Sequence, residues 1–406
     1  MLYWESMEIK LVYPAWPKFR HKTAFLMPPL GPAVVAALTP PGYGLSIADD
    51  NAAPVVCAAN ADLVAISAML VSQLPRAFAL AEEYRRLGVP VVMGGQAAWA
   101  LTNLCREHAD AVVVGEAEGL WPRVVEDARR GRLKPLYRRR GFADPNTIPA
   151  ARRDLYPADA YAYRGLRMMD LVETSRGCSL GCHHCQAPAF SGRRHRIRDV
   201  GAVIREMRGL GDGIFIVDNA LEQSLSHQKA LFRAMAGLGK YFVCHPISPE
   251  PEILELAARA GCWYVYHQIF SDSARIRRRI KLLHDFGIAV HGTVLLGLDS
   301  HGPDVFQRLL DFLLEVGLDL AEFTVLTPFP GTSLYREMKK AGRLLHEDWG
   351  RYNADEVVIQ PARMTPDQLA EGHRFLWEGF YKEQSQTLRI FRLLRRIRSR
   401  LPETVV

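Results

Sequence analysis

Three of the chain's seven cysteines lie within eight residues, at Cys178, Cys182 and Cys185. They follow a stretch, residues 169–177, whose apolar residues predict a strand. Structural zinc usually takes four ligands, often in C-x2-C pairs, and no second pair lies near. A C-x3-C-x2-C triplet suits three corners of a [4Fe–4S] cluster and leaves one iron open to a small molecule. The spacing therefore predicts such a cluster, with zinc as the alternative.

The residues after the cysteines repeat a strand and a helix. Counting the strand before the cysteines, six strand-and-helix units fill residues 169–345. Six such units predict an open (β/α)6 partial barrel, whose chemistry belongs at the C-terminal rim of the strands. The cysteines would lie at that rim.

The first part of the chain has a different organisation. Residues 8–131 alternate about five apolar strands with helical stretches, which predicts a parallel sheet covered on both faces, a Rossmann-like (flavodoxin-like) domain. Ligands of such sheets bind beyond the carboxyl ends of the strands. The loops expected there contain Asp49, Ser67, Gly94 and Gly95.

These residues carry a resemblance to known families. Over about residues 169–345 the chain resembles the radical SAM superfamily, and over 8–131 it is similar to the cobalamin-binding domain that precedes many radical SAM barrels. The resemblance implies that the three cysteines hold a [4Fe–4S] cluster whose open iron binds S-adenosylmethionine (SAM). An electron then cleaves SAM to a 5′-deoxyadenosyl radical that abstracts hydrogen from a substrate.

The resemblance also implies a cobalamin site at Ser67, Gly94, Gly95 and Asp49. In relatives that ligate cobalt from below, the notable signature is Asp-x-His-x-x-Gly. The stretch "ADDNAAP" that we align with it has no histidine, so we expect no histidine from that loop under the cobalt.

Further residues are expected to contact SAM. His184 precedes the third cysteine, where family members usually carry an aromatic residue near the adenine. Asp218 and Asn219 end the second barrel strand, where the family often has polar SAM contacts, although such residues also commonly start loops. Phe270 departs from the pattern, because it stands where relatives have a glutamate in a Gly-x-Glu-Ser stretch.

Three histidines are candidate catalytic residues. His245, His267 and His291 fall on or near the third, fourth and fifth barrel strands and would line a substrate cavity if their side chains face inward. The alternative is that each is an ordinary core histidine.

The expected domain organisation follows from these patterns. Residues 1–135 form the cobalamin-binding-like domain, 136–168 a linker, 169–345 the radical SAM domain and 346–406 a helical C-terminal extension. The extension ends in a basic amphipathic helix with Ile390, Leu394, Ile397 and Leu401 on one face. Such a helix either lies on an anionic membrane or docks on its own domain.

Composition limits the partners. The chain has 49% hydrophobic residues, a net charge of +7 and no nucleic-acid-binding motif, so we expect no nucleic-acid partner. It has no long apolar run or secretion signal, and its odd cysteine count is typical of a reducing compartment, so a cytoplasmic protein is expected, with peripheral contact at the inner membrane face as a further expectation. The implied partners are a small-molecule substrate, such as a lipid or a pigment, and an electron donor such as flavodoxin or ferredoxin.

The function best supported is that of a radical SAM enzyme, specifically a cobalamin-dependent C-methyltransferase acting on an unactivated carbon. A second interpretation is a radical SAM oxidoreductase, cyclase or dehydratase whose first domain is empty. A third, from another class, is a metal-binding module without turnover.

Overall fold

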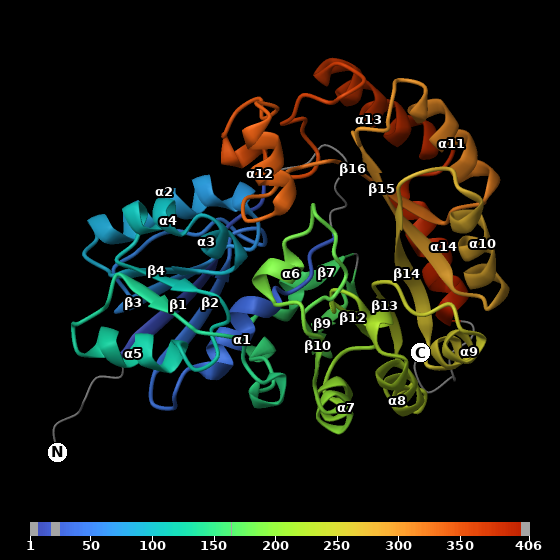
Figure 1. Cartoon of the computed structure of the whole chain (residues 1–406). Helices are drawn as coiled ribbons and strands as arrows, with labels where there is room; N and C mark the ends of the chain where they lie inside the picture. The colour runs from blue at the N-terminus through green and yellow to red at the C-terminus, as the bar shows by residue number, and fades with distance from the viewer. Residues whose placement is uncertain (1–6, 18–24, 164, 399–406) are drawn as a thin grey trace.

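The computed structural model describes residues 7–17, 25–163 and 165–398. These residues form two six-stranded sheets with helices around them (Figure 1). Leu401, expected on the apolar face of the last helix, lies outside the described residues.

The first sheet is parallel, with the order β2-β1-β3-β4-β5-β6. Its strands are β1 (Glu8–Tyr13), β2 (Gly44–Asp49), β3 (Leu63–Ser67), β4 (Val91–Gly94), β5 (Ala111–Val114) and β6 (Leu136–Arg138). The flavodoxin-like order is as predicted. The sheet continues one strand beyond residue 135, because β6 pairs with β5.

Helices cover both faces of this sheet. They are α1 (Leu30–Leu38), α2 (Leu74–Arg86), α3 (Gln96–Ala100), α4 (Thr102–His108) and α5 (Trp121–Arg129). All four residues of β5 are buried, as expected for a central parallel strand that packs on both faces.

The second sheet is an open, parallel partial barrel with the order β16-β15-β14-β13-β12-β9. Its strands are β9 (Asp170–Val172), β12 (Gly213–Ile216), β13 (Tyr241–Cys244), β14 (Cys262–Ile269), β15 (Ala289–Leu296) and β16 (Leu320–Val325). The helices between them are α7 (Val200–Arg208), α8 (Leu225–Met235), α9 (Pro251–Arg259), α10 (Ala274–Asp285) and α11 (Val305–Glu315). The predicted (β/α)6 barrel is therefore confirmed.

The first barrel strand is shorter than expected. β9 ends at Val172, and β10 (Ser175–Arg176) pairs antiparallel with β11 (Arg196–Ile197) before the cysteines begin. Short elements flank this region: β7 (Ala162–Tyr163), β8 (Leu166–Arg167) and α6 (Ala187–Phe190). The hairpin strand β10 redirects the chain between the barrel strand and the cysteine loop.

Polar side chains start several barrel helices. Asp199 accepts a hydrogen bond from the Ala202 backbone N at 2.8 Å, at the start of α7. Ser224 and Ser273 cap α8 and α10 in the same way. Such caps satisfy backbone N–H groups that the first helical turn leaves unpaired.

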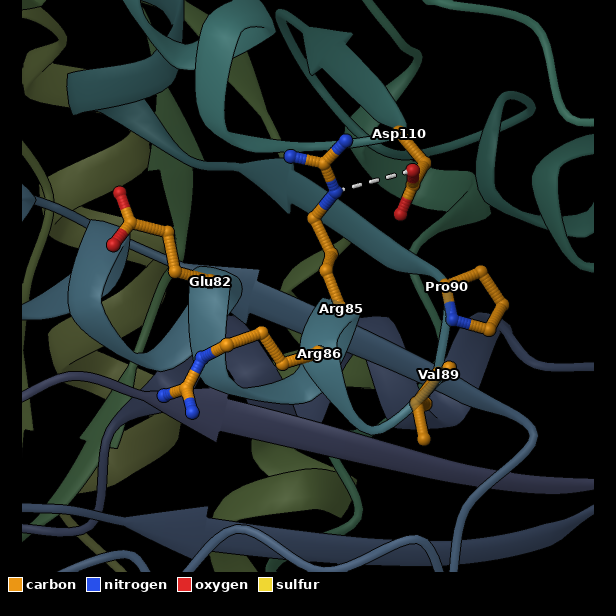
Figure 2. Close-up of a pocket in the computed structure, with 7 residues that line it drawn as sticks. Glu82, Arg85, Arg86, Val89, Pro90 and Asp110 are labelled. Carbon is orange, nitrogen blue, oxygen red and sulfur yellow. Dashed lines mark hydrogen bonds and ion pairs between the residues drawn. The ribbon is translucent and has the colours of Figure 1, made fainter.

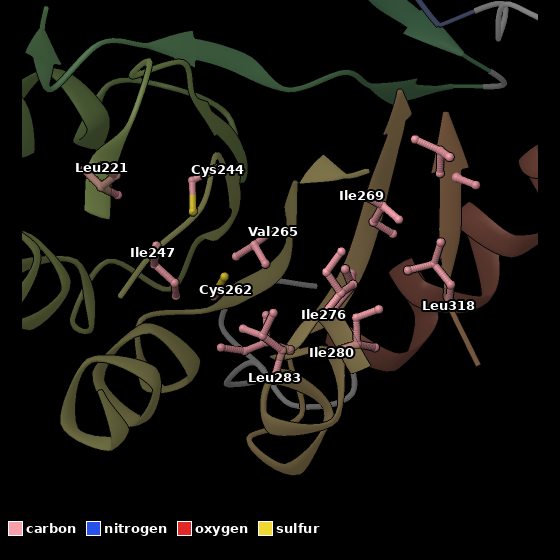
Figure 3. Packing of buried hydrophobic residues seen from close by; sticks show 14 of the residues in the cluster. Leu221, Cys244, Ile247, Cys262, Val265, Ile269, Ile276, Ile280, Leu283 and Leu318 are labelled. Atoms are coloured by element: carbon pink, nitrogen blue, oxygen red, sulfur yellow. The ribbon is translucent and has the colours of Figure 1, made fainter. Parts of the chain in front are cut away.

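Apolar side chains between the strands and helices α7–α11 form the outer core of the barrel. Val265 and Ile269 of β14 pack there with Ile276 and Ile280 of α10 (Figure 3). Cys244 and Cys262 lie in the same core, so these two cysteines are packing residues.

The chain after β16 joins the two domains. It contains α12 (Ser333–Lys340), at the end of the barrel domain, and in the C-terminal extension the short helix η6 (Trp349–Arg351), α13 (Pro366–Phe380) and α14 (Gln386–Arg398). Leu334 and Tyr352 share a core with Leu74 and Leu80 of α2. α13 packs on α11, where a side chain at Gly372 would come within 2.2 Å of the Phe306 ring.

Helix α14 docks inside the barrel. Its apolar residues Leu393 and Ile397 are buried, and Ile390 and Leu394 pack beside them. Their partners are inward-facing residues of the strands, including Trp263, Tyr264 and Leu320. The structure therefore favours the docked-helix alternative for the basic tail.

Within the described part of the chain, no helix is both long and apolar enough to cross a membrane.

Candidate functional site

The cysteine loop is fixed at its start by backbone contacts. The backbone N of Cys178 donates to the carbonyl of Gly192 at 2.9 Å. Gly177 has a φ of +85°, and a side chain there would come within 2.2 Å of the Arg194 carbonyl. A glycine is therefore required directly before the first cysteine.

The three thiols lie close enough to influence one another. Burial, together with the charge of Cys182, raises the pKa of Cys178, and burial with the charges of both other thiols raises the pKa of Cys185. Among the described residues, no three His, Cys, Asp or Glu side chains converge as a single metal ion requires. The mutual influence of the thiols places them near one another, and their C-x3-C-x2-C spacing suits three corners of a [4Fe–4S] cluster.

Asp218 holds the chain directly before this loop. Its carboxylate accepts hydrogen bonds from the backbone N of Thr174 at 2.6 Å, from Thr174 Oγ1 at 2.5 Å and from Ser175 Oγ at 2.5 Å. The side chain is almost fully buried. Asp218 therefore acts on the loop rather than as a free carboxylate at the rim, whereas Asn219 is exposed there.

Gln223 supports the same loop, and the sequence analysis did not identify it. Its Oε1 accepts from the backbone N of Ser179 at 2.6 Å, and its Nε2 donates to the carbonyl of Gly177 at 3.2 Å. No sequence pattern links a glutamine 44 residues away to this loop.

His184 lies at the rim, half-buried. Its ring centre is 6.3 Å from that of Phe270, and burial lowers the pKa of its imidazole. The residue that replaces the family glutamate therefore forms an aromatic contact beside the cysteine loop.

The crevice of the first sheet lies where the strand order reverses, between β1 and β3. Ser67 ends β3 and is paired in register with Gly94 at the end of β4. A side chain at Gly31, at the start of α1, would lie 3.7 Å from Ser67 Oγ, so this helix start also borders the crevice. Ser67 and Gly94 therefore border this crevice.

The backbone conformation itself requires glycine at Gly95, whether or not a ligand binds beside it. Its φ is +90°, and a side chain would come within 2.3 Å of the Ala68 carbonyl oxygen. That carbonyl accepts a hydrogen bond from the backbone N of Ala97 at 3.1 Å. A substitution at Gly95 would disturb the loop itself.

Asp49 lies away from the crevice, because β2 is the edge strand. Its carboxylate accepts from Tyr161 OH at 2.9 Å and from Asn51 Nδ2 at 2.7 Å. The loop that borders the crevice is the one after β1, which Gln73 Nε2 holds through the Pro14 carbonyl at 2.6 Å. The lack of histidine after β2 therefore gives no information on the lower face of a cobalt.

The crevice loops and the cysteine loop meet. Gln96 Nε2 donates to Gln186 Oε1 at 2.8 Å, and Gln186 Nε2 donates to the Pro330 carbonyl at 2.7 Å. The backbone N of Leu334, in α12, donates to the His183 carbonyl at 3.1 Å. The residue directly after Cys185 thus touches the first domain.

The three candidate histidines do not share one face. Tyr266 pairs in register with His291, and the Tyr266 and His291 rings stack with centres 4.5 Å apart. His245 lies 5.5 Å from Tyr266, so His245 and His291 are on the inner face. The expectation of three inward histidines is wrong for His267, because it alternates with Tyr266 and shares the helix-facing side with Val265.

Burial affects these histidines differently. Within the part of the chain that the structure describes, neither ring nitrogen of His291 has a hydrogen-bond partner, and burial lowers its pKa to about 3. Burial and the nearby charges of Arg279 and Arg275 lower the pKa of His267 to about 4. His245 is half-buried, and burial lowers its pKa. All three imidazoles are therefore held toward their neutral form.

A surface hollow of about 640 Å³ lies elsewhere (Figure 2). Arg85 and Asp110, which line it, form an ion pair with Nε and Oδ1 3.3 Å apart, and Val89 and Pro90 precede β4. The hollow is thus at the opposite end of the strands from the crevice and is not part of the candidate site.

Comparisons with known families agree with this geometry. A B12-binding domain model matches residues 19–125, and a radical SAM superfamily model matches residues 172–313. The chain belongs to the radical SAM superfamily. Within it, the chain falls in the group whose barrel follows a B12-binding domain, so its cofactors are an iron–sulfur cluster, SAM and cobalamin.

Individual relatives are methyltransferases. Bacteriochlorophyllide d C-12(1)-methyltransferase of Chlorobaculum tepidum is 24% identical over 87% of this chain and 82% of its own length. Hopanoid C-2 methylase of Rhodopseudomonas palustris is 23% identical over 91% of this chain and 77% of its own. The chain is thus a radical SAM enzyme, and these relatives, which it matches over most of their length, are methyltransferases.

A solved structure has the same fold. It is the radical SAM methyltransferase TsrM of Kitasatospora setae, determined with cobalamin and a [4Fe–4S] cluster bound. The TM-score is 0.63 at 18% identity, over 91% of this chain and 85% of that one.

Proposed function

We propose that this enzyme methylates a carbon atom of a small, ring-containing pigment precursor held inside the barrel. The observation that carries the proposal is the inner face of the sheet. There Phe215 and Tyr266 stack with ring centres 5.4 Å apart, and His245 lies within 6 Å of both rings. Flat aromatic surfaces favour a flat apolar substrate.

The substrate class is supported by two of the relatives, which act on bacteriochlorophyllide d at different carbons. The lipid alternative keeps the support of one relative, the hopanoid C-2 methylase, and the assay below separates the two substrate classes.

Cys178, Cys182 and Cys185 would hold the cluster, and Ser67 and Gly94 would border the cobalamin. When bound, the cluster with SAM would supply the radical for hydrogen abstraction and cobalamin the methyl group, with electrons from an external donor of the flavodoxin or ferredoxin type. Helix α14 packs on the inner face of the sheet and keeps water out of the barrel interior there.

The inward residues divide the work of binding. His245, half-buried and held toward the neutral form, contacts the substrate and offers one donor and one acceptor. His291 lies beneath Tyr266 and fixes the orientation of that ring by stacking.

The test is an anaerobic assay of the reconstituted enzyme with SAM, a low-potential reductant and bacteriochlorophyllide d. The expected products are a substrate heavier by one methyl group in place of hydrogen, 5′-deoxyadenosine and S-adenosylhomocysteine. A hopanoid precursor and tryptophan serve as comparison substrates. Methylation of the hopanoid precursor alone would contradict the pigment assignment, and 5′-deoxyadenosine without S-adenosylhomocysteine would contradict methyl transfer.

A matched pair of variants tests the inner face. His245→Ala should raise KM about tenfold or more, equivalent to a lost hydrogen bond of roughly 1.4 kcal/mol. His267→Ala changes a histidine on the opposite side of the barrel wall and should leave KM within about twofold. Equal effects of the two substitutions would contradict the placement of the substrate.

A further inference from the structure

Five charged side chains lie together between the two domains, two of them buried and three partly buried. Glu116 and Glu118 come from the loop after β5, Glu173 and Arg176 from the chain between β9 and the cysteines, and Arg196 from β11. Their exposed fractions lie between 4% and 23%. Charges taken out of water are costly unless they are paired, so the partners matter.

The pairing crosses the domain boundary. Arg196 reaches Glu116 with both arms: Nη2 lies 2.5 Å from Oε1 and Nη1 lies 3.2 Å from Oε2. Arg176 Nη1 lies 2.8 Å from Glu118 Oε1, and Arg176 Nε donates to Glu173 Oε2 at 2.7 Å. A planar guanidinium that binds two carboxylates allows little freedom in their relative position.

The two ends of this ion cluster lie beside the two cofactor sites. Glu116 follows β5, whose Val113 lies 3.8 Å from the position that a side chain at Gly94 would take in the crevice loop. Arg176 is two residues before Cys178. Arg196 lies on the strand paired with β10, next to the segment that bonds the Cys178 backbone.

We propose that Glu116 and Arg196 are positioning residues that set the distance between cobalamin and the iron–sulfur cluster. They act through the crevice loop and the cysteine loop and touch neither cofactor. The proposal rests on the proposed function, because it assumes that both cofactors act on the same substrate molecule. A separation wrong by about 1 Å costs a reaction about a hundredfold.

The test compares Glu116→Gln with Glu126→Gln in fully loaded enzyme. Glu126 lies on α5 of the same domain and pairs at the surface with Arg129, so its substitution is a matched control. Electron paramagnetic resonance measures the magnetic coupling between the reduced cluster and cob(II)alamin. Glu116→Gln should change or spread this coupling and lower methylated product per 5′-deoxyadenosine about tenfold or more, while Glu126→Gln should match the wild type.

Iron and cobalt contents should be equal in all three proteins. Wild-type coupling in Glu116→Gln would overturn the proposal, and so would an equal loss in Glu126→Gln. If Glu116→Gln fails to fold, Arg196→Lys takes its place, because it keeps the charge and removes the two-armed contact. Unchanged coupling in Arg196→Lys would likewise overturn it. Failure of the proposed function would show differently, as a wild-type enzyme that methylates nothing but still gives a fixed coupling.

Discussion

At the scale of residues, the three cysteines are the expected cluster ligands, and the side chains around them hold the cysteine loop in place. The spacing alone predicted the ligands Cys178, Cys182 and Cys185, because a short loop brings them together whatever the rest of the chain does. The groups that hold this loop, Asp218 and Gln223, come from the next barrel unit. The family resemblance made Asp218 a candidate SAM contact, with an ordinary loop start as the alternative, but sequence cannot show that Thr174 and Ser175 already occupy its oxygens.

Replacing Cys178, Cys182 and Cys185 together with alanine should remove the brown colour, the bound iron and all SAM cleavage. Cys57→Ala changes a half-buried cysteine of the first domain and should retain all three. Iron analysis of the anaerobically purified proteins measures the difference. A full iron complement in the triple variant would disprove the cluster assignment.

Asp218→Ala should loosen the cysteine loop. It removes the acceptor of the Thr174 backbone N, at a cost of about 1–3 kcal/mol for that unpaired group. The Thr174 and Ser175 hydroxyls lose their bonds to the carboxylate but keep contacts with His227 Nε2 and His195 Nε2. The expected results are a lower melting temperature and faster iron loss to a chelator. If iron loss keeps its wild-type rate, Asp218 does not hold the loop.

The buried His291 predicts a pH dependence of stability. Its pKa is about 3 in the folded chain and about 6.5 in an unfolded one, so the unfolded chain binds the extra proton first. Its contribution to stability is complete above about pH 6.5 and falls as the pH drops toward 3. His291→Phe should therefore lose less melting temperature than the wild type between pH 7 and pH 5. Parallel curves for the two proteins would refute the assignment.

At the scale of elements, alternation fixed which residues share a face but not which face is inward. On β14 both sets contain apolar residues, Tyr264 and Tyr266 on one side and Val265 and Ile269 on the other. Only the packing of α10 against Val265 and Ile269 identifies the outer side, which is why His267 was misplaced. The apolar stripe of α14 was similarly clear in sequence, while its partner surface was not.

Deleting residues 387–406 should destabilise the barrel. Two buried side chains of α14, Leu393 and Ile397, together contribute roughly 3–6 kcal/mol, a large part of the 5–15 kcal/mol that holds a typical domain folded. Thermal unfolding measures the loss, and Arg395→Ala, an exposed position on the same helix, should have little effect. A truncated protein with wild-type melting temperature and lost binding to anionic vesicles would instead support a membrane helix.

At the scale of the whole molecule, the alternation of strands and helices was enough to predict both parallel sheets. It could not predict how the domains meet. Glu116 and Arg196 are separated by 80 residues and look like ordinary surface charges in sequence. Gln96 and Gln186 are separated by 90, and no periodicity connects them. The contacts between the two domains form only when the chain folds, so sequence patterns do not predict them.

Metal analysis of the chain purified without oxygen and reconstituted with iron, sulfide and cobalamin tests most directly whether one chain holds both cofactors. We expect about four irons per chain together with a single cobalamin, and loss of the iron but not the cobalamin in the triple cysteine variant. Zinc in place of iron, or an iron-loaded chain that takes up no cobalamin, would contradict this expectation.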